Sequence, residues 1–256
     1  MLRIILRGCN GRMGQAISSI CRDRVDLTIV AGVDIDTRKL FDYPIYADPI
    51  EFRGQADVVI DFSRPDNVDE ILDYCFRQSL PLVLATTGLS ETKQLMVDVA
   101  AQKIAVFQSG NMSLGIHVLS SLVARAAAVL GEDFNIEIIE RHHNQKLDAP
   151  SGTAYMLYNA AKDALPYEAS PVYDRHERRE KRPPHEIGLH ALRGGTIVGE
   201  HEVVFAGRDE VITLSHSAQS REVFAAGAVR AAQFIAGKAP GLYNMSQLVA
   251  ESTDLL

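Results

Sequence analysis

The stretch LRIILRGCNGRMG, residues 2–14, decides the fold, because a strand runs directly into a glycine-rich turn and then a helix. Arg3–Arg7 has the pattern of a strand, and Gly11–Cys21 has the pattern of a helix. A nearly all-apolar strand follows at Leu27–Asp34, of the kind that is buried on both faces of a parallel sheet. This order predicts a βαβ unit at the start of an α/β domain.

Strands and helices continue to alternate as far as Gln108, which predicts a doubly wound, parallel, Rossmann-type sheet. Further strands are expected at Asp57–Phe62, Pro81–Thr86 and Ile104–Gln108, with helices at about Asp66–Gln78 and Glu91–Gln102. We therefore expect a first domain over residues 1–112.

After an apolar helix, Leu114–Leu130, the pattern changes to alternating strands joined by short turns. The strands are expected at Phe134–Glu140, Ile187–Arg193, Thr196–Ala206 and Val211–His216. They predict a second, α+β domain over residues 113–220, built on a mixed or antiparallel sheet. The C-terminal segment, 221–256, is expected to form a helix that packs back on the first domain, with its clearest helical pattern at Arg221–Gly237.

The composition is that of a globular protein, with 256 residues, 46% hydrophobic and 23% charged. A formal net charge of −7 argues against nucleic acid or an anionic membrane as a partner. The first residues, LRIILRG, have the pattern of a strand and no apolar run approaches the roughly 18 residues of a membrane helix, so we expect no signal peptide or membrane helix and a cytoplasmic protein. Cys9, Cys21 and Cys75 are widely spaced, which predicts buried free thiols.

The glycine-rich turn predicts a dinucleotide site. Gly8, Gly11 and Gly14 are spaced GxxGxxG rather than the commoner GxGxxG, so a turn without a ligand is the alternative. Asp34 follows twenty positions after Gly14, where a carboxylate accepts hydrogen bonds from a ribose. The cofactor residues expected here are Gly8, Cys9, Asn10, Gly11, Arg12, Met13, Gly14 and Asp34.

Two further segments fall at carboxyl ends of parallel strands, where open α/β sheets bind ligands. They are Ala85, Thr86 and Thr87, and Ser109, Gly110, Asn111 and Met112. Each also fits a capped turn before a helix. Asp34 and Asp36 favour NADH, whereas Arg12, Arg38 and Lys39 could hold the 2′-phosphate of NADPH, so NADH, NADPH or both are expected.

The segment ERHHNQKLDAPSGTA, residues 140–154, has the pattern of a strand-to-helix turn. Ser151 or Thr153 can cap the helix, and the amides of Gly152 and Thr153 are expected to face outward, toward a carboxylate. Lys146 adds a positive charge beside them. The segment therefore predicts a site for a small anionic substrate.

His142 and His143 are adjacent, so their side chains are expected to point to opposite sides and to have separate roles. A pair of structural surface histidines is one alternative. A metal site is another, but no metal-ligand spacing accompanies the pair and Lys146 would oppose a divalent cation, so no metal is expected. The neighbouring Lys146 favours an acid–base role.

The charge run RHERREKRPP, Arg175–Pro184, predicts a solvated loop, with a mobile flap over the site as the alternative.

Six motifs together resemble the 4-hydroxy-tetrahydrodipicolinate reductase (dihydrodipicolinate reductase) family of lysine and diaminopimelate biosynthesis. They are GCNGRMG, DFSRPD (61–66), ATTG (85–88), SGNMSLG (109–115), ERHHNQKLDAPSGTA and GGTIVGEHEVVF (194–205). The resemblance covers residues 3 to about 250. It implies an NAD(P)H-binding Rossmann domain, and a smaller domain that binds a small dicarboxylate substrate and builds a homotetramer.

The resemblance also implies roles for single residues. His142 is the expected proton donor and acceptor, and Lys146 the expected proton donor. His143, Gly152 and Thr153 are expected to hold the carboxylates of the substrate. Ala85 and Met112 stand where the family commonly has glycine and phenylalanine, and no arginine directly follows Asp34, which weakens the expectation of an NADPH contact.

Two rival functions remain open at this point. One is another two-domain NAD(P) dehydrogenase, acting on an aspartate-like or imine substrate. The other is a nucleotide sensor without catalysis, which His142, His143 and Lys146 disfavour because a sensor needs only the glycine turn and Asp34.

Overall fold

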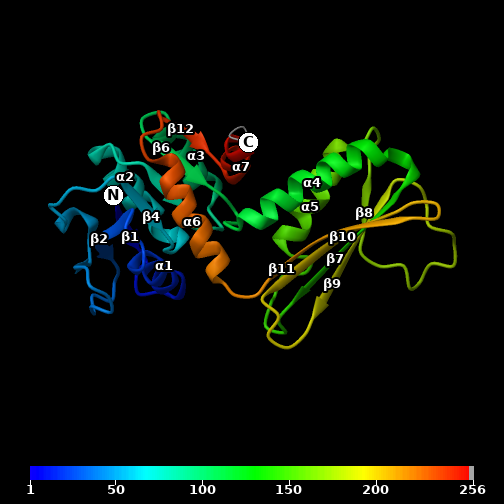
Figure 1. The fold of residues 1–256 in the computed structure, drawn as a ribbon, viewed down its shortest axis with the longest axis horizontal. Helices are drawn as coiled ribbons and strands as arrows, with labels where there is room; N and C mark the ends of the chain where they lie inside the picture. Colours follow the sequence, from blue (N-terminus) through cyan, green and yellow to red (C-terminus); the bar gives the residue numbers. More distant parts are fainter. Residues whose placement is uncertain (254–256) are drawn as a thin grey trace. The chain divides into compact units, whose positions relative to one another are not determined.

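The structure is a computed structural model that describes residues 1–253. It divides into two compact units, one formed by Met1–Leu114 with the segment from Arg221 onward, and the other by Gly115–Ser220. Each unit has its own sheet (Figure 1). Each also has its own hydrophobic core. The second unit is thus a single insertion in the sequence of the first.

The first unit is built on a seven-stranded sheet in which every pairing is parallel. Its order is β12-β6-β5-β4-β1-β2-β3, which contains the strand order of a doubly wound dinucleotide fold. The strands are β1 (Leu2–Arg7), β2 (Leu27–Val33), β3 (Ile45–Tyr46), β4 (Val58–Asp61), β5 (Leu82–Leu84), β6 (Ala105–Gln108) and β12 (Gly241–Tyr243). The helices are α1 (Arg12–Arg22), α2 (Val68–Gln78), α3 (Glu91–Ala101), α6 (Glu222–Ile235) and α7 (Met245–Thr253), with 3-10 turns at Pro49–Glu51 and Pro65–Asn67. The predicted Rossmann-type parallel sheet is confirmed.

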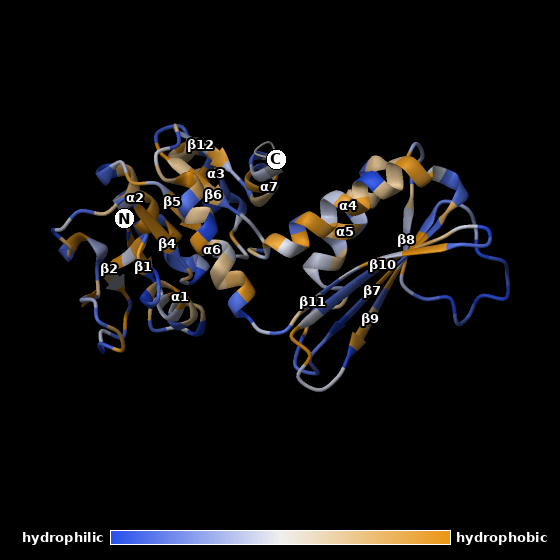
Figure 2. Cartoon of the chain, viewed as in Figure 1, coloured by the Kyte–Doolittle hydropathy of each residue, from blue (hydrophilic) through white to orange (hydrophobic). Residues whose placement is uncertain are grey.

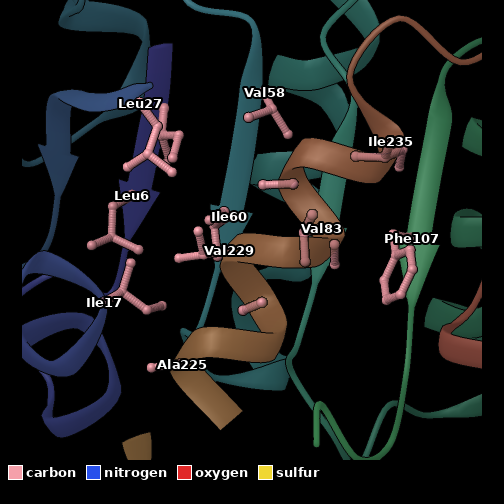
Figure 3. Close-up of a cluster of buried hydrophobic side chains, with 14 of the residues drawn as sticks. Leu6, Ile17, Leu27, Val58, Ile60, Val83, Phe107, Ala225, Val229 and Ile235 are labelled. Carbon is pink, nitrogen blue, oxygen red and sulfur yellow. The ribbon is translucent and has the colours of Figure 1, made fainter. Parts of the chain in front are cut away.

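Apolar side chains cover both faces of this sheet. Leu6, Ile60 and Phe107 lie on the face covered by α6 (Figure 3). Ile5 lies on the other face, in a cluster with Ile71 of α2. Because successive strand residues point to opposite faces, a strand buried on both sides carries apolar residues at consecutive positions, as β1 does over Ile4–Leu6.

The second unit is a five-stranded mixed sheet in the order β11-β10-β7-β9-β8. The strands are β7 (Asn135–His142), β8 (Ser170–Val172), β9 (Glu186–Arg193), β10 (Gly199–Ala206) and β11 (Val211–Ala218). β10 pairs antiparallel with β7 and β11, whereas β9 pairs parallel with β7 and β8. The helices are α4 (Leu114–Leu130) and α5 (Gly152–Ala164), with a 3-10 turn at Gly131–Asp133. The predicted mixed sheet is confirmed.

The C-terminal segment differs from the single helix that the sequence predicted. Helix α6 ends at Ile235, and the chain then adds β12 beside β6 before α7 begins. Strands β3 and β8 were also not predicted. All three strands have two or three residues, too short for an alternating pattern to show.

Helix α4 corrects the expectation that no apolar run is long enough to span a membrane. Leu114–Asp133, which includes the following 3-10 turn, has 20 residues and a mean hydropathy of 1.6, enough by length and composition alone. Only 22% of its most apolar window is buried. Its buried residues, Ile116, Leu119, Val123 and Ala127, recur every three or four positions and belong to the core of the second unit. A one-sided apolar stripe of this kind is typical of a helix that covers a sheet.

The charge run Arg175–Pro184 forms a largely exposed, uniformly hydrophilic loop after β8 (Figure 2). Three of its arginines, Arg175, Arg178 and Arg182, are nevertheless paired with carboxylates of the sheet. Arg175 contacts Glu137 (2.9 Å) and Glu186 (3.3 Å), and Arg182 contacts Glu137 (3.1 Å). The loop is therefore held to β7 and β9 by ion pairs as well as solvated.

Candidate functional site

Glycines shape the turn between β1 and α1. Gly8 has φ of 76°, and a Cβ there would lie 2.8 Å from the carbonyl oxygen of Phe62. A Cβ on Gly14 would lie 2.2 Å from the carbonyl oxygen of Gly8, so α1 packs directly on the turn. Gly11 is the N-cap and has no side chain to bond the first amides of α1. Those amides are therefore suited to an anionic group such as a pyrophosphate.

Asp34 follows β2 and is bonded to the same turn. Its carboxylate accepts hydrogen bonds from the backbone amides of Asn10 (2.9 Å) and Asp36 (3.1 Å). The side-chain amide of Asn10 donates to the carbonyls of Asp36 (2.6 Å) and Arg38 (2.9 Å), while its Oδ1 is buried without a partner among the described residues. A turn that admits no Cβ, beside a carboxylate and an orphaned buried oxygen, fits a dinucleotide.

The other two predicted cofactor segments follow β5 and β6, at the same edge of the parallel sheet as the glycine turn. The side chains of Cys9, Thr86 and Met112 are buried, and Thr86 Oγ1 donates to Asp61 Oδ2 (3.0 Å). We therefore expect these three residues to meet a ligand through their backbone. The remaining members, Ala85, Thr87, Ser109, Gly110 and Asn111, are exposed or half-buried.

Asp61 is a residue of this edge to which the sequence suggested no role. It ends β4, is fully buried, and accepts a hydrogen bond from the amide of Ser63 (3.1 Å) as well as from Thr86. Burial raises the pKa of Asp61, against the opposing charge of Arg7 at 3.8 Å. A carboxylate at the end of the apolar strand VVID was the available signal.

His142 lies at the end of β7, on the buried face of the second unit's sheet. Its Nδ1 lies 2.5 Å from Glu140 Oε2, and its ring lies edge-on to the ring of His201, with 5.2 Å between centroids. His143 follows the strand and is half-exposed. The two neighbouring histidines therefore have different surroundings.

Lys146 and the start of α5 lie in the connection that follows. The amide of Lys146 donates to the carbonyl of His143 (3.2 Å), and its ammonium lies 3.0 Å from Asp148 Oδ1. Ser151 is the N-cap of α5, since its Oγ accepts from the amide of Ala154 (3.1 Å). Gly152, the first residue of the helix, is exposed. One connection thus joins β7 to the α5 N-terminus and carries a lysine between them.

Three residues of this region, Glu140, Arg193 and His201, were not predicted as functional candidates. Glu140 is fully buried and paired with Arg193, at 2.8 and 2.9 Å. His201 of β10 is 4% exposed, and its Nε2 lies 3.2 Å from Ser151 Oγ. Burial, followed by the nearby charge of His142, lowers the pKa of His201 to about 4. The available signal was a polar residue at an inward position of an alternating strand, as Glu140 is in FNIEIIE.

The cysteines are free and buried, as predicted. Burial raises the pKa of Cys9 and of Cys21 to about 11, so these thiols stay protonated at neutral pH. Within residues 1–253 no group of three or more histidine, cysteine, aspartate or glutamate side chains could hold a metal ion.

Solved structures share the fold. The dipicolinate-bound dihydrodipicolinate reductase from Paenisporosarcina sp. TG-14 superposes with a TM-score of 0.80 at 23% identity, covering 95% of this chain and 97% of that one. GenD2 from gentamicin A biosynthesis, in complex with NAD, superposes with a TM-score of 0.62 at 11% identity, covering 99% and 92%. At these identities the likeness is one of fold.

Sequence comparison reaches further. The family model described as "Dihydrodipicolinate reductase, N-terminus" matches residues 2–112, and that described as "Dihydrodipicolinate reductase, C-terminus" matches residues 115–249. The 4-hydroxy-tetrahydrodipicolinate reductases of Caldanaerobacter subterraneus subsp. tengcongensis and Clostridium tetani are 52% and 46% identical to this chain. The alignments cover 97% and 96% of this chain and 98% and 96% of the relatives. The chain therefore belongs to the dihydrodipicolinate reductase family.

Proposed function

We propose that this protein reduces 4-hydroxy-tetrahydrodipicolinate to tetrahydrodipicolinate in lysine and diaminopimelate biosynthesis, with NADH or NADPH as the reductant. The observation that carries the proposal is that each of the two family matches contains one of the two candidate sites described above. The N-terminal match contains the glycine turn with Asp34, and the C-terminal match contains His142, Lys146 and the α5 N-terminus.

The nucleotide supplies a hydride to C4 of the substrate ring when it is bound. Gly8 to Gly14, Asp34, Ala85 to Thr87 and Ser109 to Met112 are the residues that would hold it. In the structure Asp34 accepts two backbone hydrogen bonds, and Arg38 is paired with Asp36 (2.6 Å). A negative charge there repels a 2′-phosphate, which supports a preference for NADH.

The second unit supplies the substrate site in this proposal. Loss of water from the 4-hydroxy substrate leaves a conjugated imine; hydride addition at C4 then gives an electron-rich ring, and a proton must reach the carbon next to C4. His142 acts as proton donor and acceptor and Lys146 as proton donor. His143, with the backbone of Gly152 and Thr153, binds the carboxylates, since helix N-termini and ammonium groups attract anions.

The organisation follows the same assignment. Residues 1–112 with 221–256, of which 254–256 lie outside the described residues, form the dinucleotide-binding domain, and residues 113–220 form the domain for substrate binding and oligomerisation. We propose a cytoplasmic homotetramer with no nucleic-acid or membrane partner, supported by the net charge of −7 and by the family resemblance.

The proposal is tested by supplying pyruvate and aspartate semialdehyde through the preceding synthase and following the absorbance of NADH or NADPH. We expect oxidation that requires the synthase, both of its substrates and this protein. Failure of both nucleotides to be oxidised would reject the proposed activity.

A further inference from the structure

The carboxylate of Glu140 receives four hydrogen bonds although it is fully buried. Its Oε1 accepts from the amide of Ser151 (3.0 Å) and from Nη2 of Arg193 (2.9 Å). Its Oε2 accepts from Nη1 of Arg193 (2.8 Å) and lies 2.5 Å from Nδ1 of His142. Each oxygen thus has two partners, drawn from β7, β9 and the N-cap of α5.

The charge of Glu140 fixes which nitrogen of His142 carries a proton. Burial alone would raise the pKa of Glu140, but hydrogen bonds from Arg193 and His142 outweigh it, and the pKa lies below its usual value. An ionised carboxylate can only accept hydrogen bonds. Nδ1 of His142 must therefore be the donor, which makes Nε2 the nitrogen that gains and loses a proton.

Backbone hydrogen bonds fix the end of β7, which carries His142. Gly194 donates its amide to the carbonyl of His142 (2.9 Å), and Asn144 donates to the carbonyl of Gly195 (3.2 Å), so the end of β7 is fastened to the turn after β9. On the other side of the ring, a Cβ on Gly199 would lie 3.1 Å from Nε2. A residue without a side chain therefore borders the nitrogen that Glu140 leaves available.

We propose that Glu140 is a positioning residue: it holds His142 with its proton on Nδ1, presents Nε2 for proton exchange with the substrate, and ties this histidine to the N-terminus of α5. The inference rests on the proposed function for the identity of the substrate. In the forward step the Nε2–H bond breaks, its electron pair stays on nitrogen, and the proton forms the new C–H bond. The hydride comes from the nicotinamide cofactor.

Other charged and titratable groups surround this pair. Arg193 faces Glu140 from β9, His201 packs against His142 from β10, and the charges of His216 on β11 and Lys146 also act on His201. Glu140 hydrogen-bonds both the imidazole of His142 and the amide of Ser151, whereas His201 meets the His142 ring edge-on and the Ser151 hydroxyl.

Glu140→Gln in the full chain tests the proposal through the pH profile of turnover. We expect kcat to fall on the order of 10- to 100-fold. We also expect the pH profile of kcat to change, because the variant lacks the carboxylate that holds the proton on Nδ1. The Kd of NADH, measured on the same samples, should be unchanged and reports that the protein is folded.

Glu137→Gln is a matched control. Glu137 lies on the same strand, on the opposite face, and its carboxylate also contacts arginines and a histidine, Arg175, Arg182 and His190. Its pH profile should match the parent enzyme. A Glu140→Gln profile identical to that of Glu137→Gln would overturn the proposal.

Two measurements keep the proposal falsifiable if Glu140→Gln does not fold. Gly199→Ala places a methyl group beside Nε2 of His142 and leaves Glu140 unchanged. We expect a lower kcat and an unchanged Kd for NADH. Turnover equal to that of the parent enzyme would argue against Nε2 as the nitrogen that exchanges the proton. In the unsubstituted protein, ¹⁵N spectra of labelled histidine should show neutral His142 protonated at Nδ1. Protonation at Nε2 would overturn the proposal even if the enzyme proves to act on another substrate.

Discussion

Two buried carboxylates, Asp61 in the first unit and Glu140 in the second, are both fully buried and both face an arginine. Arg7 reaches Asp61 only at 3.8 Å, and burial leaves the pKa of Asp61 above its usual value. Arg193 reaches Glu140 with two nitrogens at 2.8 and 2.9 Å, and the pKa of Glu140 lies below its usual value despite burial.

The difference shows how the surroundings of a buried acid decide its charge. Four hydrogen bonds, two of them from Arg193, outweigh the desolvation of Glu140, whereas Asp61 has one distant cation and hydrogen bonds from the uncharged Ser63 and Thr86. It also reflects how the two candidate sites are built. The first unit uses glycines and backbone amides, which suit a pyrophosphate, and the second uses charged side chains, which suit proton transfer.

The largest expected effect is on turnover, in the second unit. His142→Ala should lower kcat on the order of 10²- to 10⁴-fold, the usual contribution of a general acid or base. The Kd of NADH should stay within about twofold, because the glycine turn belongs to the other unit. Steady-state kinetics and nucleotide titration check both; parent-like turnover would mean that the proposed role of His142 is wrong.

The next largest effect is on the free energy of unfolding, which allows a direct comparison of the two carboxylates. Glu140→Gln should lower the free energy of unfolding by about 3 kcal/mol, because it leaves Arg193 facing an amide. Asp61→Asn should cost at most about 1 kcal/mol, since Arg7 keeps Glu70 (2.9 Å) and the carbonyl of Asn67 (2.8 Å) as partners. Urea unfolding of both variants measures the difference. Equal losses would contradict the contrast between the sites.

Acid should destabilise the second unit through His201. Its pKa is about 4 in the folded protein and near 6.5 in the unfolded chain, so between these values the unfolded state binds more protons. Stability should therefore fall by up to about 3 kcal/mol as the pH drops from about 6.5 to 4. Thermal unfolding between about pH 4 and 6.5 measures this dependence. His201→Asn should make stability less dependent on pH in this range, whereas His176→Asn, at an exposed position, should not. A pH dependence unchanged by His201→Asn would show that His201 is not its cause.

The smallest effect concerns cofactor choice in the first unit. Asp34→Asn should improve the kcat/KM ratio of NADPH over NADH by roughly tenfold, because it removes a charge that repels the 2′-phosphate. Asp23→Asn, an exposed acid at the end of α1, is the control and should leave the ratio unchanged. An unchanged ratio in Asp34→Asn would place the ribose elsewhere.

Much of the fold could be predicted because its strands are buried in regular ways. β1 and β2 are mostly apolar on both faces, and β7 alternates, so their patterns identify the parallel and the mixed sheet. β3, β8 and β12 could not be predicted, because two or three residues show no period.

The residues of the candidate sites could be predicted only where they lie close together in the sequence. Gly8 to Gly14 and His142 to Thr153 are continuous segments whose residue types indicate their chemistry. Glu140 and Arg193 are 53 positions apart, and His201 and Ser151 are 50 apart. Their contacts depend on the pairing of β7 with β9 and β10, which one sequence does not reveal.

The most direct test is the affinity of pyridine-2,6-dicarboxylate, an aromatic analogue of the proposed substrate, for the protein with saturating NADH. The account predicts that Lys146→Ala raises the Kd of the dicarboxylate at least about tenfold, the loss of one charge-assisted contact, while the Kd of NADH stays the same. A dicarboxylate Kd unchanged by Lys146→Ala would contradict the assignment of the second unit as the substrate site.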